Sequence, residues 1–102
     1  MIKVGVFYPQ SKKFDWDYYM SKHMPMVGKL LGSALKKVEI DKGVAGGAPG
    51  SAATYQAVCL LHLDSVEAFR AAFGPHAAQI MGDIPNYTDI APVIQISEVV
   101  VG

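Results

Sequence analysis

The chain has 102 residues, of which 51% are hydrophobic, and its nine Lys and Arg side chains balance its nine Asp and Glu side chains. This length predicts a single domain over residues 1–102, and the balanced charge argues against nucleic acid or an anionic membrane as a partner. No segment reaches the roughly 20 apolar residues of a membrane helix, and the N-terminal apolar run is too short for a signal peptide. Because Cys59 is the only cysteine, no intrachain disulfide can form, and we expect a soluble protein of the reducing cytoplasm.

The first half of the chain predicts a strand and a long amphipathic helix. Residues 2–8 (IKVGVFY) form a β-rich run that stops at a proline. Asp15 is the expected N-cap of the helix, Phe14 should pack on its fourth residue as a hydrophobic staple, and Gly32 is its expected end. The hydroxyl of Tyr18 should point to solvent. Seven residues share one face at helical spacing and should point to the core: Trp16, Tyr19, Met20, His23, Val27, Leu30 and Leu31.

The second half predicts three strands and a second helix. The elements are strands at 34–44, 54–63 and 93–101, a glycine-rich connection at 45–53, and a helix at 65–73 followed by two more turns. Asp64 should cap this helix, with Glu67 completing a capping box. The Gly74-Pro75 pair should break or restart it, because proline has no N–H to donate.

The order βαββαβ predicts the ferredoxin-like α+β fold, a four-stranded antiparallel sheet with both helices on one face. In the third strand an apolar row should lie under the helices: Tyr55, Ala57, Cys59, Leu61 and Leu63. The opposite row is mixed: Gln56, Val58, Leu60 and His62. A mixed face is poorly suited to water, so we expect a homodimer whose two sheets face each other in a dimeric α+β barrel. The alternative is a monomer with a partly hydrophobic sheet face.

His23 is the leading candidate for a catalytic residue. It lies on the apolar face of the first helix, two residues before Pro25, which cannot donate to the carbonyl of Ser21. The helix should therefore be irregular near residues 21–25 and leave room for a small pocket above the sheet. Tyr19 lies one turn earlier on the same side and could orient an acid/base imidazole. The alternative is a core histidine that a backbone carbonyl satisfies.

Four further residues are candidates for binding a small-molecule ligand, each with a structural alternative. Cys59 could pair with His23 for nucleophilic or proton-transfer work, or be an inert buried thiol, because its apolar row raises the thiol pKa. Tyr55 and Tyr87 could line the pocket or fill the core. Asp83 could orient the imidazole or merely end the second helix.

The sequence predicts no bound metal and no cofactor. His62 and His76 do not pair with His23 at a spacing typical of a metal site. The chain also has no G-x-G-x-x-G or P-loop pattern, so a nucleotide-dependent reductase reaction has no binding motif in this sequence.

Two motifs resemble the EthD family, small proteins of the dimeric α+β barrel superfamily named for ethyl tert-butyl ether degradation. The F-D-x-x-Y-Y-x-x-x-H-x-P signature falls on Phe14, Asp15, Tyr18, Tyr19, His23 and Pro25. An acidic motif near the C-terminus falls on Asp83, Asn86, Tyr87 and Asp89. The family is commonly labelled reductase or oxidoreductase, and the resemblance implies a homodimer with a pocket between helices and sheet.

The resemblance also implies a function linked to oxygenase systems, because similar members accompany them. We expect a small protein that acts on or binds an apolar or aromatic, oxygen-bearing molecule in a catabolic or oxygenase pathway. Its alternatives are a non-catalytic accessory module for a partner oxygenase, and a cofactor-independent isomerase or lactone-type enzyme like others in the superfamily. A weaker alternative is a haem-binding relative with His23 as the axial ligand.

Overall fold

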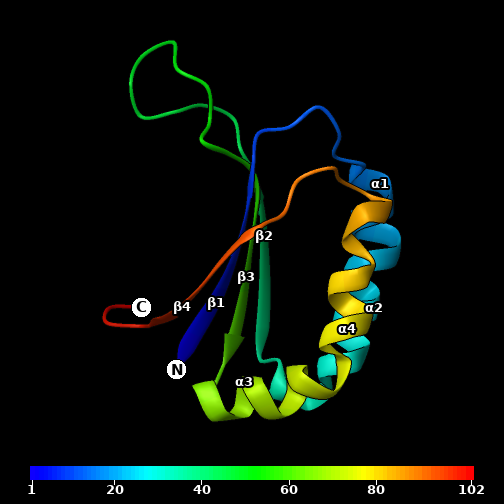
Figure 1. Ribbon diagram of the computed structural model, residues 1–102. Coiled ribbons are helices and arrows are strands. Elements are labelled where there is room, and N and C mark those ends of the chain that lie inside the picture. Colours follow the sequence, from blue (N-terminus) through cyan, green and yellow to red (C-terminus); the bar gives the residue numbers. More distant parts are fainter.

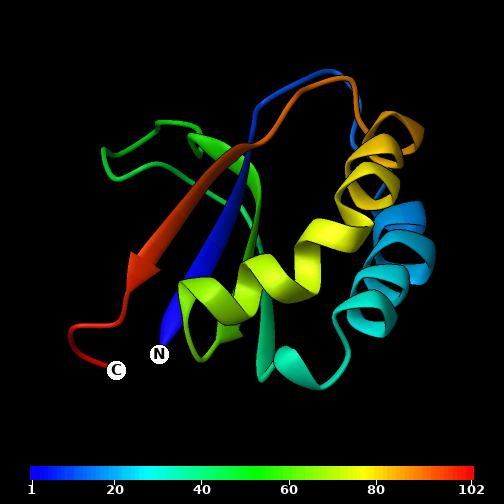
Figure 2. The ribbon, with the colours of Figure 1, turned by 60° about the horizontal axis from the view of Figure 1, so that its bottom comes forward.

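The computed structural model describes all 102 residues and has the predicted βαββαβ order. The strands β1 (Ile2–Pro9), β2 (Lys37–Lys42), β3 (Tyr55–Leu63) and β4 (Val93–Glu98) form one antiparallel sheet in the spatial order β2-β3-β1-β4. All helices lie on the same side of this sheet (Figures 1 and 2). The ferredoxin-like α+β fold predicted from the sequence is therefore confirmed.

Two helical segments cover the sheet. The first comprises α1 (Trp16–Tyr18), a π-helical turn (Tyr19–His23), α2 (Met24–Leu31) and a 3-10 turn (Gly32–Ala34). The second comprises α3 (Val66–Phe73), a 3-10 turn (Gly74–His76), α4 (Ala77–Gly82) and a 3-10 turn (Ile84–Asn86). In both views α4 lies beside α2. None of the helices has the length and apolar character that a membrane-spanning helix requires.

The first helical segment begins as the sequence predicts. The Asp15 carboxylate accepts a hydrogen bond from the backbone N–H of Tyr18 at 3.0 Å. The Phe14 ring packs on the Tyr19 ring with a centroid distance of 5.1 Å, which is the expected staple. Gly32 ends α2 with a φ of 59°, in the left-handed region that favours glycine.

The predicted irregularity of this helix is a π-helical turn. The N–H of Met24 donates to the carbonyl of Tyr19, five residues earlier instead of four. The wider turn carries the helix into Pro25, which has no N–H to donate. Tyr19 and His23, at the two ends of the turn, are both buried. The turn therefore fixes two inward-facing polar side chains four residues apart.

Two local predictions are wrong. The N-cap of α3 is Ser65, not Asp64, because the Ser65 hydroxyl is the group that reaches the N–H of Ala68, at 3.0 Å. Met20 was expected in the core but is 48% exposed. It lies one residue, about 100°, around the helix from the buried Tyr19 and so falls outside the apolar face.

The helix-free face of the sheet is mixed, as predicted. Leu60 and His62 of β3 are partly buried on this face. Tyr55 was predicted under the helices, but its ring packs on Phe7 on the helix-free face, with a centroid distance of 5.3 Å. The cause is a bulge, where the pairing of β1 with β3 shifts register between Tyr8 and Pro9. A shift of one residue moves a side chain to the other face of a strand.

Candidate functional site

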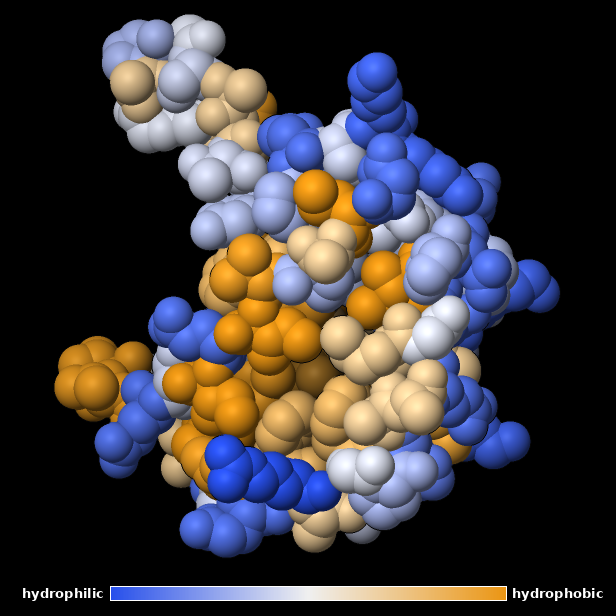
Figure 3. All heavy atoms as spheres, in the orientation of Figure 1, coloured by the Kyte–Doolittle hydropathy of each residue, from blue (hydrophilic) through white to orange (hydrophobic).

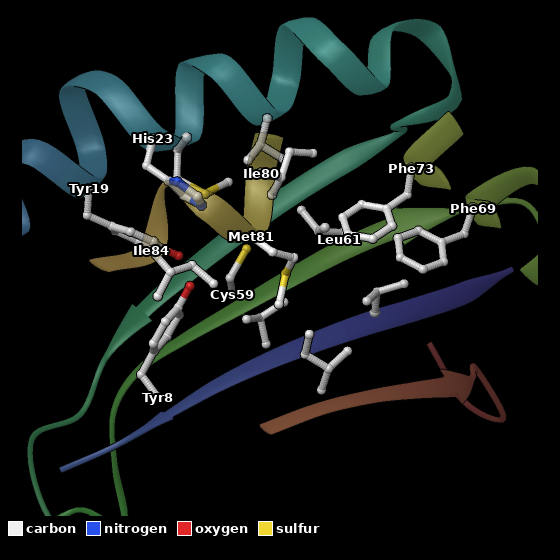
Figure 4. Close-up of a pocket in the computed structure, with 15 residues that line it drawn as sticks. Tyr8, Tyr19, His23, Cys59, Leu61, Phe69, Phe73, Ile80, Met81 and Ile84 are labelled. Atoms are coloured by element: carbon white, nitrogen blue, oxygen red, sulfur yellow. The ribbon is translucent and has the colours of Figure 1, made fainter. Parts of the chain in front are cut away.

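A cavity of about 140 Å³ lies between the sheet and the helices (Figure 4). Fourteen of its fifteen lining residues are hydrophobic, and His23 is the exception. An apolar cavity of roughly 150 Å³ elsewhere is known to bind benzene, so this volume suits one six-membered ring. Ile94 of β4 lines the cavity yet is 45% exposed. Figure 3, in the orientation of Figure 1, shows a hollow that is bordered mainly by hydrophobic residues.

His23 is held on both sides of its ring. Its Nδ1 lies 2.8 Å from Oδ2 of Asp83, and its Nε2 lies 3.3 Å from the Tyr87 hydroxyl. Oδ1 of Asp83 accepts hydrogen bonds from the Tyr18 hydroxyl at 2.6 Å and the Asn86 side-chain amide at 2.9 Å. The carboxylate is thereby fixed in place, and it fixes the orientation of the imidazole.

The protonation states of this pair follow from their surroundings. Burial lowers the pKa of His23 below its ordinary value of 6.5, and the opposing effect of Asp83 is smaller. Burial alone would raise the pKa of Asp83, but the hydrogen bonds that the carboxylate accepts outweigh it and hold this pKa below its ordinary value. At neutral pH the imidazole is therefore uncharged and the carboxylate ionised. The imidazole donates its Nδ1–H to Asp83 and can accept a hydrogen bond at the lone pair of Nε2.

This tautomer sets the direction of a chain of hydrogen bonds. The Tyr87 hydroxyl must donate to Nε2 of His23, because an uncharged imidazole with a proton on Nδ1 can only accept there. The Tyr8 hydroxyl, 2.6 Å from that of Tyr87, then donates to it. Burial raises the pKa of Tyr8 to about 12, so this phenol stays protonated. The chain runs from Tyr8, which lines the cavity, through Tyr87 and His23 to Asp83.

Tyr19 lines the cavity and contacts the ring of His23 by stacking, without a hydrogen bond to it. The two rings stack, with a centroid distance of 5.7 Å and an interplanar angle of 16°, and Asp83 provides the orienting hydrogen bond. Tyr19 is fully buried, and its hydroxyl has no hydrogen-bond partner in the protein. A buried polar group left unpaired costs about 1–3 kcal/mol.

The other candidates lie in different surroundings. Cys59 lines the cavity, and burial raises the pKa of its thiol to about 11, as expected of an unreactive buried thiol. Tyr87 belongs to a buried aromatic cluster and reaches the cavity only through its bonds to Tyr8 and His23. Asp83 binds the imidazole, one of its two expected roles. Tyr55 lies on the opposite face of the sheet, outside the cavity.

Sequence reasoning missed the roles of Tyr8 and Tyr18. The position of Tyr8 could have been predicted, because side chains alternate between the two faces of β1 and Tyr8 therefore shares the helix-facing row with Val4 and Val6. Tyr18 was expected to point to solvent. Its hydroxyl is engaged because the segment after α4 folds back against the start of α1, where the N–H of Asp15 donates to the carbonyl of Tyr87 at 2.7 Å.

The residues of this site do not fit a metal ion or a haem. No cluster of three or more histidine, cysteine, aspartate or glutamate side chains could hold a metal. His62 lies outside the site and pairs with Glu39 at 2.6 Å on the helix-free face. Both nitrogens of His23 are engaged, and a cavity the size of one six-membered ring is too small for the four-ring macrocycle of a haem.

Comparison with known proteins identifies relatives along almost the whole chain. The family model described as the EthD domain matches residues 8–91. The crystal structure of an EthD-like protein from Ralstonia eutropha JMP134 is 53% identical, with a TM-score of 0.91, over 98% of this chain and 92% of that one. No match was found among curated proteins.

Two more distant crystal structures share the fold alone. An ethyl tert-butyl ether degradation (EthD) family protein from Bacillus halodurans C-125 is 19% identical with a TM-score of 0.66, over 96% of this chain and 97% of that one. A dimeric ferredoxin-like protein of unknown function from Thermobifida fusca YX is 18% identical with a TM-score of 0.56, over 94% of this chain and 87% of that one.

Proposed function

The chain belongs to the EthD family, and from that premise we propose that it acts on a small apolar, oxygen-bearing molecule in the cavity, with His23 as its acid/base group. The observation that carries this proposal is the ordered hydrogen-bond chain that joins an apolar cavity to a buried, uncharged histidine. Uncharged histidine near neutral pH is suited to accept a proton. The family supports a role in a catabolic or oxygenase pathway of the cytoplasm.

The chain of hydrogen bonds moves a proton without forming a stable phenolate. As Tyr8 takes a proton from the ligand, it passes its own proton to Tyr87, which passes one to Nε2 of His23. The ligand loses one proton and the imidazole gains one. The neighbouring Asp83 carboxylate stabilises the imidazolium that results. A concerted transfer is needed because burial raises the pKa of both tyrosines.

A second candidate function is binding without turnover, as in an accessory module that holds an intermediate for a partner oxygenase. The observation that favours it is the lining, in which His23 and the hydroxyls of Tyr8 and Tyr19 are set among apolar side chains. Such a surface can hold an uncharged ligand by burial of apolar area alone. The two candidates differ in whether the protein transfers protons to and from a bound ligand.

Hydrogen–deuterium exchange of a ketone separates the two functions. In D2O, cyclohexanone exchanges the hydrogens next to its carbonyl, and a base that reaches them accelerates the exchange. We expect the wild-type protein to accelerate this exchange and His23→Gln to slow it by about 100-fold. Binding without acceleration would favour the accessory module over the enzyme.

Occupation of the cavity is tested by filling it. Val6 lines the cavity from β1, and Val6→Phe should abolish binding of cyclohexanone in an NMR titration. Val44 is 93% exposed in the connection between β2 and β3, so Val44→Phe is a matched control that should bind normally. Equal binding by both variants would place the ligand outside this cavity.

The helix-free sheet face supports a homodimer. It carries Phe7, Tyr55, Val58 and Leu60 as partly buried apolar residues and Val93, which is 51% exposed. Exposed apolar surface of this extent commonly marks an interface. The ferredoxin-like relative from Thermobifida fusca is described as dimeric. Two copies of this chain would bury this face by bringing their sheets together.

A further inference from the structure

The Tyr19 hydroxyl is a polar group of the cavity that the proposed proton transfer does not use. Tyr19 is fully buried, and its hydroxyl is the one buried side-chain polar atom of the chain without a hydrogen bond of acceptable geometry. The Cys59 thiol lies near it, but a thiol is only a weak acceptor and does not replace an oxygen partner. Figure 4 shows it at the end of the cavity where His23, Tyr8 and Cys59 also lie. Buried polar groups are nearly always paired in native proteins, so an unpaired one aimed into a cavity indicates a missing partner.

The Tyr19 ring cannot turn its hydroxyl away from the cavity. It stacks on His23, and it contacts Phe14, Trp16 and Tyr87 with centroid distances of 5.1, 5.8 and 5.1 Å. The position of the hydroxyl in the cavity is therefore fixed before a ligand binds. A preorganised donor of this kind binds more tightly than one that must be ordered on binding.

The charge of the cavity limits which partner this hydroxyl can take. No lysine or arginine lines the cavity, and His23 is uncharged at neutral pH. A carboxylate or phosphate would therefore be buried without a counter-ion, which is strongly unfavourable. Burial raises the pKa of Tyr19, so its hydroxyl remains protonated and acts as a donor. The missing partner is thus an uncharged acceptor.

We propose that the Tyr19 hydroxyl donates a hydrogen bond to an uncharged carbonyl or ether oxygen of the ligand. The site then selects ring-sized ketones and ethers over hydrocarbons of the same shape and over carboxylates. This inference rests on the proposed function, because it requires the ligand to occupy the cavity. It assigns Tyr19 to recognition of the ligand and leaves proton transfer to the chain that ends at His23.

Three ring compounds of similar size test the inference by NMR titration: cyclohexanone, methylenecyclohexane and cyclohexanecarboxylate. The first two differ only in an oxygen that replaces a CH2 group. We expect the wild-type protein to bind cyclohexanone about tenfold more tightly than methylenecyclohexane, the effect of one net hydrogen bond. The carboxylate should not bind measurably at neutral pH.

Tyr19→Phe should remove the preference and leave the affinity for methylenecyclohexane unchanged. It should also raise the melting temperature of the free protein, because it removes an unpaired buried hydroxyl. Tyr55→Phe, which removes a phenol outside the cavity, is the matched control and should keep the preference.

The outcomes separate this inference from the proposed function. Equal affinity of the wild-type protein for the two uncharged rings would overturn the inference and leave the cavity as a binding site. A preference that survives in Tyr19→Phe, or a lower melting temperature of that variant, would also overturn it. If neither ring binds the wild-type protein, both the inference and the proposed function are wrong.

Discussion

Tyr87→Phe removes the central hydroxyl of the chain that links Tyr8 to His23. Tyr87 is fully buried, and its hydroxyl lies 2.6 Å from that of Tyr8 and 3.3 Å from Nε2 of His23. The substitution preserves the ring and its contacts, so it tests the hydrogen bonds with little change in packing. It should destabilise the protein even though a phenol becomes a more hydrophobic ring.

The magnitude follows from counting the affected groups. Tyr87→Phe removes two hydrogen bonds and leaves the buried Tyr8 hydroxyl without a partner. Together these losses should lower the free energy of unfolding by about 3 kcal/mol. Tyr8→Phe loses one bond and costs about 1 kcal/mol, because Tyr87 still donates to His23. The double variant loses the same two hydrogen bonds but leaves no buried hydroxyl without a partner, so its free energy of unfolding should fall by about 2 kcal/mol. The two substitutions should therefore be coupled by about 2 kcal/mol.

Urea denaturation of the four proteins measures this coupling as a double-mutant cycle. Thermal melts should agree, since about 1 kcal/mol corresponds to roughly 4–8 °C in a domain of this size. Tyr55→Phe serves as the control and should change stability little. If the two single effects simply add up in the double variant, the two hydroxyls do not interact and the hydrogen-bond chain is wrong.

Four other substitutions test three separate features. Burial lowers the pKa of His23 in the folded protein below 6.5, so the unfolded chain binds a proton at this residue more readily than the folded chain does. The free energy of unfolding should therefore fall as the pH drops from 6.5 toward the lower pKa of the folded state. His23→Gln should remove this contribution in urea titrations across that range, and an unchanged pH dependence would contradict the assigned burial. Ser65→Ala should lower the free energy of unfolding by about 1 kcal/mol, because α3 loses its N-cap, whereas Asp64→Ala should change it little. A larger effect of Asp64→Ala would show that Asp64 is the N-cap after all. Leu60→Asp should convert a dimer into monomers in light scattering, because an unpaired charge is disfavoured in a dry interface, and a wild-type monomer would exclude the proposed interface.

Most of the fold could be predicted because local signals agree with the tertiary structure. The Asp15 cap, the Phe14 staple and the Gly32 end all act within one or two turns of the helix, so the sequence contains each partner of the interaction. The choice of Ser65 over Asp64 could not be settled in this way, since both are good N-cap residues. It depends on which side chain reaches the Ala68 N–H.

The candidate site was predictable only in part, because its partners are distant in the sequence. The apolar helix face and Pro25 placed His23 above the sheet, but the expected partner, Tyr19, stacks on the ring instead of hydrogen-bonding to it. The hydrogen bond to the imidazole comes from Asp83, in one of the two roles that the sequence left open for this residue, and Asp83 reaches His23 because the chain folds back after α4. Tyr55 lies on the other face of the sheet because a bulge changes the register of the pairing between β1 and β3. The alternation of apolar and polar residues in the sequence does not reveal such a change.

Side-chain 15N NMR of the histidines during addition of cyclohexanone would show directly whether the cavity binds a ligand beside an uncharged His23. We predict that His23 carries its proton on Nδ1 at neutral pH and that its ring resonances shift as the ring compound binds. Those of His62, which lies on the helix-free face, should not move. A proton on Nε2 of His23, or His23 resonances that stay unchanged at saturating cyclohexanone, would contradict both the hydrogen-bond chain and the site built on it.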